Sequence, residues 1–141
     1  MNQQGIEHQN LRPEHIYISQ DQIGEDPKIK ILGFSQHKKT LENEDFNYNA
    51  PSFERYDKDV WCLGIILFRM MTHQMPFKTA TDLQSDAPFD SLQNTGYSKE
   101  LITLVKQLLS RAERPTFASL TVNLLKEKIS EDEAKLIEQE N

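Results

Sequence analysis

The sequence is poor in cysteine, in positive charge and in long apolar stretches, and each shortage excludes a class of protein. Its single cysteine, Cys62, cannot form an intramolecular disulfide, so we expect a buried and inert thiol. The net charge is -6 without any basic stripe, which excludes a nucleic-acid partner because nothing would neutralise the phosphates. The one basic cluster, at 37–39, is short and is predicted to lie in a solvated loop.

Segments that would place the chain in a membrane are also lacking. The longest apolar run, at 60–71, is interrupted by Arg69 and is too short to span a bilayer. No charged start followed by an apolar stretch marks a signal peptide. We therefore expect a cytoplasmic protein that has no membrane partner.

Candidate metal ligands are few and badly spaced. No pair among the histidines and the cysteine has the close spacing of a zinc ligand set, so no metal site is predicted. The residues considered are His8, His15, His37, His73 and Cys62.

Apolar periodicity predicts a short hairpin and a buried helix. Segments 14–19 and 28–32 have the character of strands, and a turn rich in Gly, Asp and Pro joins them. Residues 36–58 are polar and are predicted to form a long loop. Segment 59–73 is apolar on nearly all faces, which is typical of a helix in the middle of a domain.

Further helices are predicted towards the C-terminus. Apolar residues recur at helical spacing in 98–110 and again in 115–127, where Pro115 starts the helix. Ser130 and Glu133 fit a capping box, so a separate and solvated helix is expected from that point. The predicted class is α+β, mainly α.

Six short motifs, in this order, resemble the large C-terminal lobe of eukaryotic protein kinases. They are HQNLRPEH at 8–15, IKILGFS at 29–35, YNAPS at 48–52, DVWCLGIIL at 59–67, MPF at 75–77 and RP at 114–115. They are similar in turn to the catalytic loop H-R-D-L-K-P-E-N, the D-F-G strand, A-P-E, the D-V-W-S-L-G start of the central helix, P-F and R-P. Any one motif is weak, but six in order are a strong signal. The resemblance covers 1–127 and implies a kinase-like C-lobe with a short β-hairpin and a central buried helix, followed by an acidic helical tail over 128–141.

The resemblance implies that the positions used for phosphoryl transfer carry unsuitable side chains. The position of the catalytic base is Asn10, whose amide cannot take up a proton near neutral pH. The magnesium-ligand positions are Gly33, which has no side chain, and His15, whose imidazole suits a hard cation poorly. Only Arg12 keeps a charge, at the position of the family's lysine, where it could bind an anion. We therefore expect no intact catalytic site and neither ATP nor magnesium as a cofactor.

Other matching positions are structural in the family. The resemblance implies that His8 and Phe34 belong to an apolar column through the core. Asp59 matches the buried carboxylate that holds the catalytic-loop backbone, and Trp61 belongs to the best-preserved motif.

Two positions leave alternatives open. Arg114 matches an arginine that pairs with the glutamate of A-P-E, which here is Ser52, so either Glu54 replaces that partner or Arg114 faces solvent. Tyr17 matches a small aliphatic residue under the adenine ring, so it either fills that space or simply packs in the hairpin.

In the resembling family, a glycine-rich loop, a nucleotide-anchoring lysine and a helix precede the catalytic loop, and the sequence starts too late to supply them. Helix 59–73 would then expose an apolar face. Either the chain is a fragment of a longer protein or a partner covers the gap. We expect the isolated chain to aggregate, to self-associate or to need a partner, unless one of its ends folds back over the gap.

The leading hypothesis is a catalytically inactive pseudokinase segment that acts as a protein-interaction or scaffold module. Its contact would be a protein partner or the missing upstream kinase segment. The alternative is a divergent or truncated protein serine/threonine kinase that transfers the γ-phosphate of ATP to protein hydroxyls, with magnesium. A third interpretation is a non-functional remnant.

Overall fold

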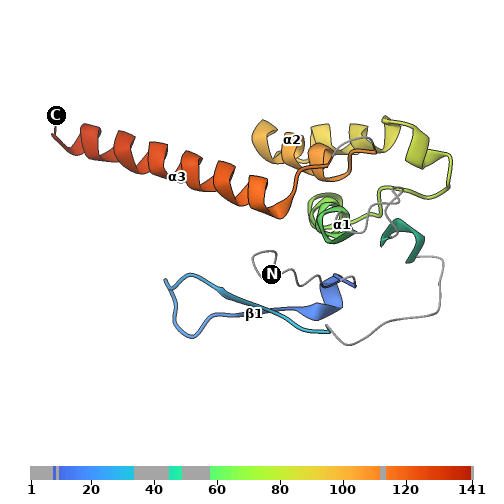
Figure 1. Ribbon diagram of the computed structural model, residues 1–141, viewed down its shortest axis with the longest axis horizontal. Coiled ribbons are helices and arrows are strands. Elements are labelled where there is room, and N and C mark those ends of the chain that lie inside the picture. The colour runs from blue at the N-terminus through green and yellow to red at the C-terminus, as the bar shows by residue number, and fades with distance from the viewer. Residues whose placement is uncertain (1–7, 9, 34–44, 49–57, 112–113, 141) are drawn as a thin grey trace.

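The structure, a computed structural model, describes residues 8, 10–33, 45–48, 58–111 and 114–140. Within these ranges the chain is mainly helical and contains a two-stranded antiparallel sheet, which confirms the predicted mixture. The hairpin, helix α1 (Lys58–Thr72) and helix α2 (Lys99–Leu108) form successive layers with α1 in the middle (Figure 1). The predicted positions Phe34, Ser52 and Glu54 and the basic cluster at 37–39 lie outside the described residues.

The predicted hairpin is present, with shorter strands. Strand β1 (Ile16–Ser19) pairs with β2 (Lys28–Ile31), and Ile16 faces Ile31 across the ladder. The residues before β1 form a 3₁₀ turn, Pro13–His15, instead of continuing the strand. Alternation places the isoleucines on one face, and the half-buried Ile16 and Ile31 pack against the core. The other face carries Tyr17 opposite Lys30.

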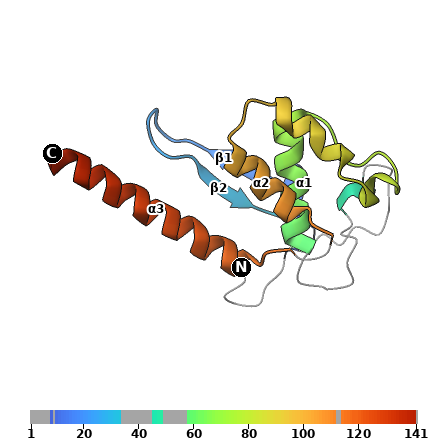
Figure 2. The same ribbon diagram turned by 90° about the horizontal axis from the view of Figure 1, so that it is seen from above.

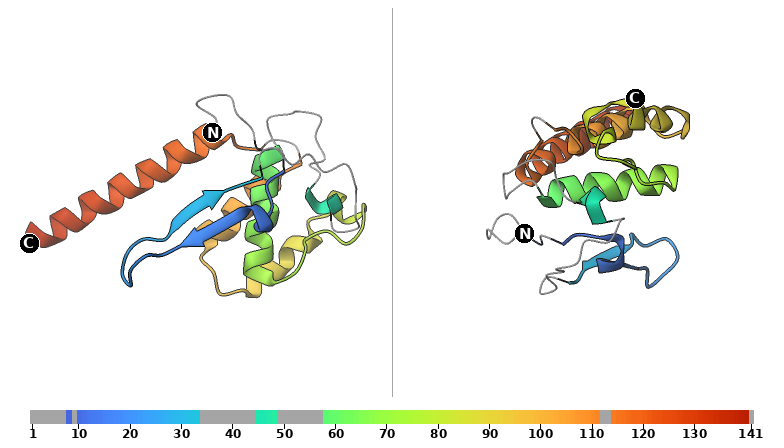
Figure 3. Two further views of the ribbon diagram at one scale, coloured as in Figure 1. Left: turned by 90° about the horizontal axis from the view of Figure 1, so that it is seen from below. Right: turned by 90° about the vertical axis from the view of Figure 1, so that its right-hand side faces the viewer.

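Helix α1 is the buried element that the apolar run predicts. Trp61 and Ile65 are completely shielded from solvent, and Phe68 nearly so. The helix ends where His73 adopts a positive φ of 59° and donates its backbone N–H to the carbonyl of Arg69. Burial on both sides of α1 makes it the structural centre of the described chain, because the hairpin and α2 lie on opposite sides of it (Figure 3).

Helix α2 packs closely on α1. Its N-terminus is capped by Ser98, whose hydroxyl accepts the backbone N–H of Leu101 at 3.2 Å. A Cβ atom added to Gly64 of α1 would lie 2.8 Å from the side chain of Leu109 and 2.9 Å from that of Leu108. Glycine at this position therefore permits the short distance between the two helices.

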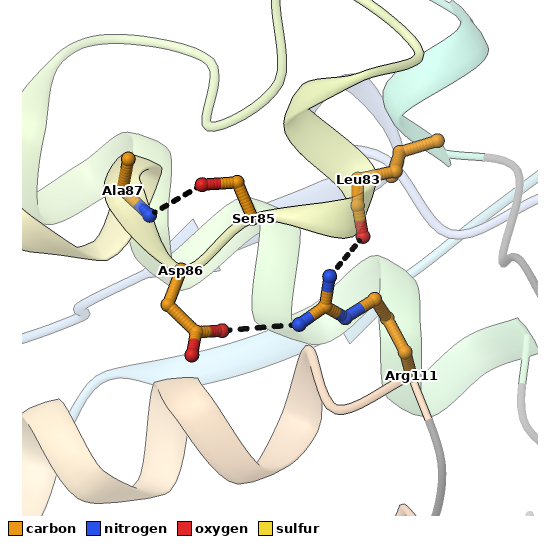
Figure 4. A network of polar contacts seen from close by, with 5 residues as sticks. All are labelled: Leu83, Ser85, Asp86, Ala87 and Arg111. Carbon is orange, nitrogen blue, oxygen red and sulfur yellow. Dashed lines mark hydrogen bonds and ion pairs between the residues drawn. The ribbon is translucent and has the colours of Figure 1, made fainter.

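A polar network holds the segment between the two helices. This segment contains the 3₁₀ helices η5 (Asp82–Gln84) and η6 (Ala87–Asn94). Arg111 donates to the carbonyl of Leu83 at 2.8 Å and pairs with Asp86 at 3.1 Å (Figure 4). The exposed position of this ion pair makes it a weak contributor to stability, and its geometric role is to fix the turn at Ser85.

Helix α3 (Phe117–Glu140) is one continuous helix of 24 residues. The separate start predicted at Ser130 is wrong, because no Gly or Pro interrupts 117–140 and serine is tolerated inside a helix. The helix begins at Phe117 and not at Pro115 as predicted, and Thr116 caps it, since its hydroxyl accepts the backbone N–H of Ser119 at 3.1 Å. Helix α3 extends away from the layered body and does not fold back over α1 (Figure 2).

Candidate functional site

The site lies where the chain before β1 meets the end of β2 and the start of α1. His8 is 1% exposed, and its backbone N–H donates to the carboxylate of Asp59 at 2.8 Å. Its ring Nε2 lies 2.6 Å from the carbonyl oxygen of Leu32. Its ring Nδ1 accepts the backbone N–H of Asn10 at 3.2 Å, so Nε2 carries the proton and donates to Leu32. Three separate elements are thereby tied together through one histidine and one buried carboxylate.

Asn10 forms hydrogen bonds through both its side chain and its backbone. Its side-chain oxygen accepts a hydrogen bond from Nε of Arg12 at 3.0 Å. Its carbonyl oxygen lies 2.8 Å from Nδ1 of His15, which donates because a carbonyl can only accept. The amide of Asn10 is neutral, so this position offers no group that takes up a proton near neutral pH.

Arg12 lies against an aromatic ring. Its guanidinium carbon is 4.7 Å from the ring centroid of Tyr48, which is 3% exposed. Burial raises the pKa of the Tyr48 hydroxyl above its ordinary value, and the nearby charge of Arg69 offsets only part of this effect.

The ring of His15 fills the space that a side chain at position 33 would need. Gly33 has a φ of +86°, and a Cβ atom added there would lie 2.8 Å from three ring atoms of His15. A carboxylate side chain at position 33 therefore meets the imidazole directly. The structure brings these two positions together and leaves no room for a longer side chain beside the ring as it stands.

Tyr17 lies in strand β1 of the hairpin, opposite Lys30. Its side chain is 54% exposed and lies on the strand face opposite the isoleucines that contact the core. Tyr17 is therefore a residue of the hairpin, as the second alternative has it, with its side chain partly open to solvent. The first alternative, that Tyr17 fills an adenine-binding space, stays a prediction.

Comparison with known proteins relates the chain to protein kinases. No family model matches the sequence, and no solved structure matches it either. Ribosomal protein S6 kinase alpha-4 of Mus musculus is 33% identical over 89 residues, which are 55% of this chain and 12% of the kinase. Developmentally-regulated protein kinase 1 of Dictyostelium discoideum is 31% identical over 123 residues, which are 76% of this chain and 16% of that protein. Sperm motility kinase 2B of Mus musculus is 31% identical over 91 residues, 55% of this chain and 18% of the kinase.

The chain contains a protein-kinase-like segment. This result confirms the resemblance to protein kinases that the six sequence motifs carry. The chain spans less than a fifth of the length of each of these kinases, so the similarity concerns a small part of each of them.

The core of the kinase-like segment is built around Trp61. Its Nε1 donates to the backbone carbonyl of Asn47 at 2.6 Å, and its ring stacks on Phe77 with centroids 5.5 Å apart. The guanidinium carbon of Arg114 lies 5.3 Å from the Trp61 ring, and Arg114 also donates to the carbonyl of Ser110 at 2.7 Å. Arg114 is half-buried, so the solvent-facing alternative is wrong. The other alternative, Glu54, lies outside the described residues.

Asn47 is a structural residue that the sequence does not reveal. It belongs to the 3₁₀ helix η3 (Asp45–Tyr48), inside the segment predicted to be a loop, and it is 3% exposed. Its side chain donates to the carbonyl of Phe77 at 2.9 Å and accepts the backbone N–H of Phe77 at 3.0 Å. A single polar residue whose partner lies 30 positions away leaves no periodic pattern in a sequence.

Cys62 is buried, as predicted, and burial raises its pKa to about 12.

In the described ranges, no three of the His, Cys, Asp and Glu residues lie close enough together to hold a metal ion. None of the helices in the described part of the chain combines the length and apolar character needed to cross a membrane.

Proposed function

We propose that the kinase-like segment is catalytically inactive and acts as a protein-interaction module. The observation that carries the proposal is the mutual fit of Gly33 and His15, since a Cβ atom at position 33 would lie 2.8 Å from the imidazole. By resemblance, these are the two positions that hold magnesium in active kinases. A hard cation needs oxygen ligands, and this pair offers no side-chain oxygen.

The loss of the base position acts in the same direction. General-base catalysis is worth about 10²–10⁴ in rate, and the amide of Asn10 cannot supply it. Its side-chain oxygen instead accepts a hydrogen bond from Arg12 at 3.0 Å. We infer that Asn10 and Arg12 have a structural role in the loop.

An apolar groove between the hairpin and α1 supports the binding role. It has a volume of about 460 Å³, and its lining residues include Ile16, Ile18, Ile66 and Met70. Ile18 is 66% exposed and Met70 is 61% exposed, so large apolar side chains lie open to solvent side by side. Exposed apolar surfaces of this kind are typical of binding sites. The proposed occupant is an apolar protein segment, supplied by a partner or by a preceding kinase segment.

Activity and nucleotide binding test the first half of the proposal. We expect no transfer of phosphate from magnesium-ATP to protein substrates, and no change in melting temperature on addition of magnesium-ATP. The alternative, a divergent serine/threonine kinase, is favoured by the retained charge of Arg12, by the intact fold motifs and by the sequence similarity to kinases. Turnover by the purified chain that disappears in an Arg12→Ala variant would establish this alternative and overturn the proposal.

The groove is tested by matched substitutions on one hairpin. Ile18→Asp places a charge in the groove, whereas Ile23→Asp changes a fully exposed residue outside it. We expect the wild-type chain to self-associate or aggregate, and Ile18→Asp to reduce this markedly while Ile23→Asp does not. Equal light scattering from the two variants, or a wild-type chain that stays monomeric and dispersed, would contradict the role of the groove.

A further inference from the structure

A second groove lies between α2 and α3, on the side of the molecule away from the hairpin. It has a volume of about 740 Å³, and its apolar lining consists of the half-buried Leu101, Leu104 and Leu120. Asn123 and Lys126 of α3 continue its wall along the helix. The groove therefore has an apolar lining contributed by both helices.

The face of α3 that borders this groove continues beyond it. Ile137 follows Lys126 by eleven positions and Asn123 by fourteen, which are about three and about four helical turns, so the three share one face. Ser130 and Ala134 lie between them on that face, and both are small and exposed. The outer part of the helix thus presents Ile137, which is 62% exposed, with small residues that permit close approach.

Charge is distributed unequally along the same helix. Between positions 130 and 138 the outer segment carries Glu131, Asp132, Glu133 and Glu138 against one lysine, Lys135. The inner groove carries Lys99 and Lys126 against Glu100. Glu133 follows Lys126 by about two turns and therefore lies on the same edge of the helix. The outer segment carries acidic side chains beside the apolar Ile137, and the groove has an apolar lining with lysines at its rim. The two surfaces are therefore complementary in charge and in apolar character, although the net charge of the chain is negative.

We propose that two copies of this chain dock through antiparallel α3 helices, with Ile137 of each copy seated in the α2–α3 groove of the other. A two-fold axis passing near residue 130 brings position 137 of one helix opposite position 122 of its partner, beside Asn123 and Leu120. The same axis brings Glu133 of each copy opposite Lys126 of the other. The interface is self-complementary, so it closes after two copies. This surface is separate from the hairpin groove, and the proposal does not depend on the proposed function.

Charge reversal tests the pairing of the two helices in the full chain carrying Ile18→Asp, because that substitution reduces association through the hairpin groove. Lys126→Glu and Glu133→Lys each place like charges at both contacts, so each should raise the dimer dissociation constant roughly tenfold in sedimentation equilibrium. An equimolar mixture of the two variants should form a heterodimer, and the double variant should regain wild-type dimerisation. The two positions are two turns apart on one helix, so recovery reports a contact between copies.

Two neighbouring apolar residues supply a matched control for the groove. Ile137 and Leu136 are both 62% exposed on α3, but Leu136 lies off the proposed face. Ile137→Asp should weaken the dimer by more than roughly tenfold, whereas Leu136→Asp should leave it near wild type. Helix content from circular dichroism should be the same in both variants. Equal effects of the two substitutions, a monomeric wild type at micromolar concentration, or association of indefinite size that ignores the charge reversals would each overturn the proposal.

Discussion

The buried carboxylate of Asp59 accepts the backbone N–H of His8 at 2.8 Å, across 51 positions of the sequence. Asp59 stands in the first turn of α1, and His8 bonds through its ring to the end of β2. One carboxylate therefore joins the two outer parts of the site to the central helix.

Asp59→Ala should destabilise the fold by about 1–3 kcal/mol, because it leaves a buried donor without its acceptor. The measurement is urea unfolding followed by tryptophan fluorescence, with Trp61 as the single reporter. Asp90→Ala, which changes an exposed carboxylate, should stay within about 0.5 kcal/mol of wild type. An Asp59→Ala variant as stable as wild type would show that this carboxylate does not hold the site together.

Alanine substitutions at two glycines distinguish the free-energy cost of backbone strain from the cost of steric overlap. Gly24 and Gly33 both have positive φ, but only a Cβ atom at Gly33 meets another residue within 4 Å. Gly24→Ala should cost about 1–2 kcal/mol from the backbone alone, and Gly33→Ala should cost a further 1–3 kcal/mol or so from overlap with His15. In a His15→Ala background this further cost should disappear. If Gly33→Ala costs no more than Gly24→Ala, the imidazole does not fill that space.

Gly64→Ala tests the close contact between α1 and α2. Alanine ordinarily favours a helix over glycine by about 1 kcal/mol, but the added methyl group would overlap Leu109 and Leu108, at a cost of about 1–3 kcal/mol. We expect a net loss of stability in urea. A double-mutant cycle with Leu109→Ala should show a favourable coupling, because the smaller side chain makes room. Higher stability of Gly64→Ala alone would mean that the two helices separate easily.

The Cys62 thiol should be unreactive in the folded state and should make stability depend on alkaline pH. Its pKa rises from 9.0 to about 12 on folding, so the unfolded chain loses this proton first as the pH increases. Its contribution to stability is retained below pH 9 and is lost as the pH rises towards 12. Tyr48, whose pKa is also raised, acts in the same direction at slightly higher pH. In a Cys62→Ala variant the free energy of unfolding should fall less steeply as the pH rises from 9 towards 12. In the wild-type protein the thiol should react with a thiol reagent only when the chain unfolds.

Local patterns in the sequence predict the elements well. Period-two alternation places the hairpin, and a run that is apolar all round places α1, because both patterns report burial directly. The capping-box pattern at Ser130 fails because it signals a helix start only where the preceding chain is not already helical.

Contacts between distant residues are harder to predict. The motif resemblance brings His8, Gly33 and Asp59 into one neighbourhood, as the structure does. It gives no indication that the rings of His15 and His8 lie 5.6 Å apart, or that His15 takes the space beside Gly33. Asn47 escapes prediction for the same reason, since its importance arises only when Phe77 and Trp61 meet it.

The layered order of the fold implies unequal resistance to opening. Helices α1 and α2 meet through a continuous apolar contact, whereas the hairpin is attached by two half-buried isoleucines and the His8 hydrogen bonds. Opening the hairpin exposes little apolar surface compared with separating the helices, so it costs less free energy. Compared with the α1–α2 pair, the hairpin should therefore detach and rejoin more readily without global unfolding, and a ligand that contacts both the hairpin and α1 should oppose this opening.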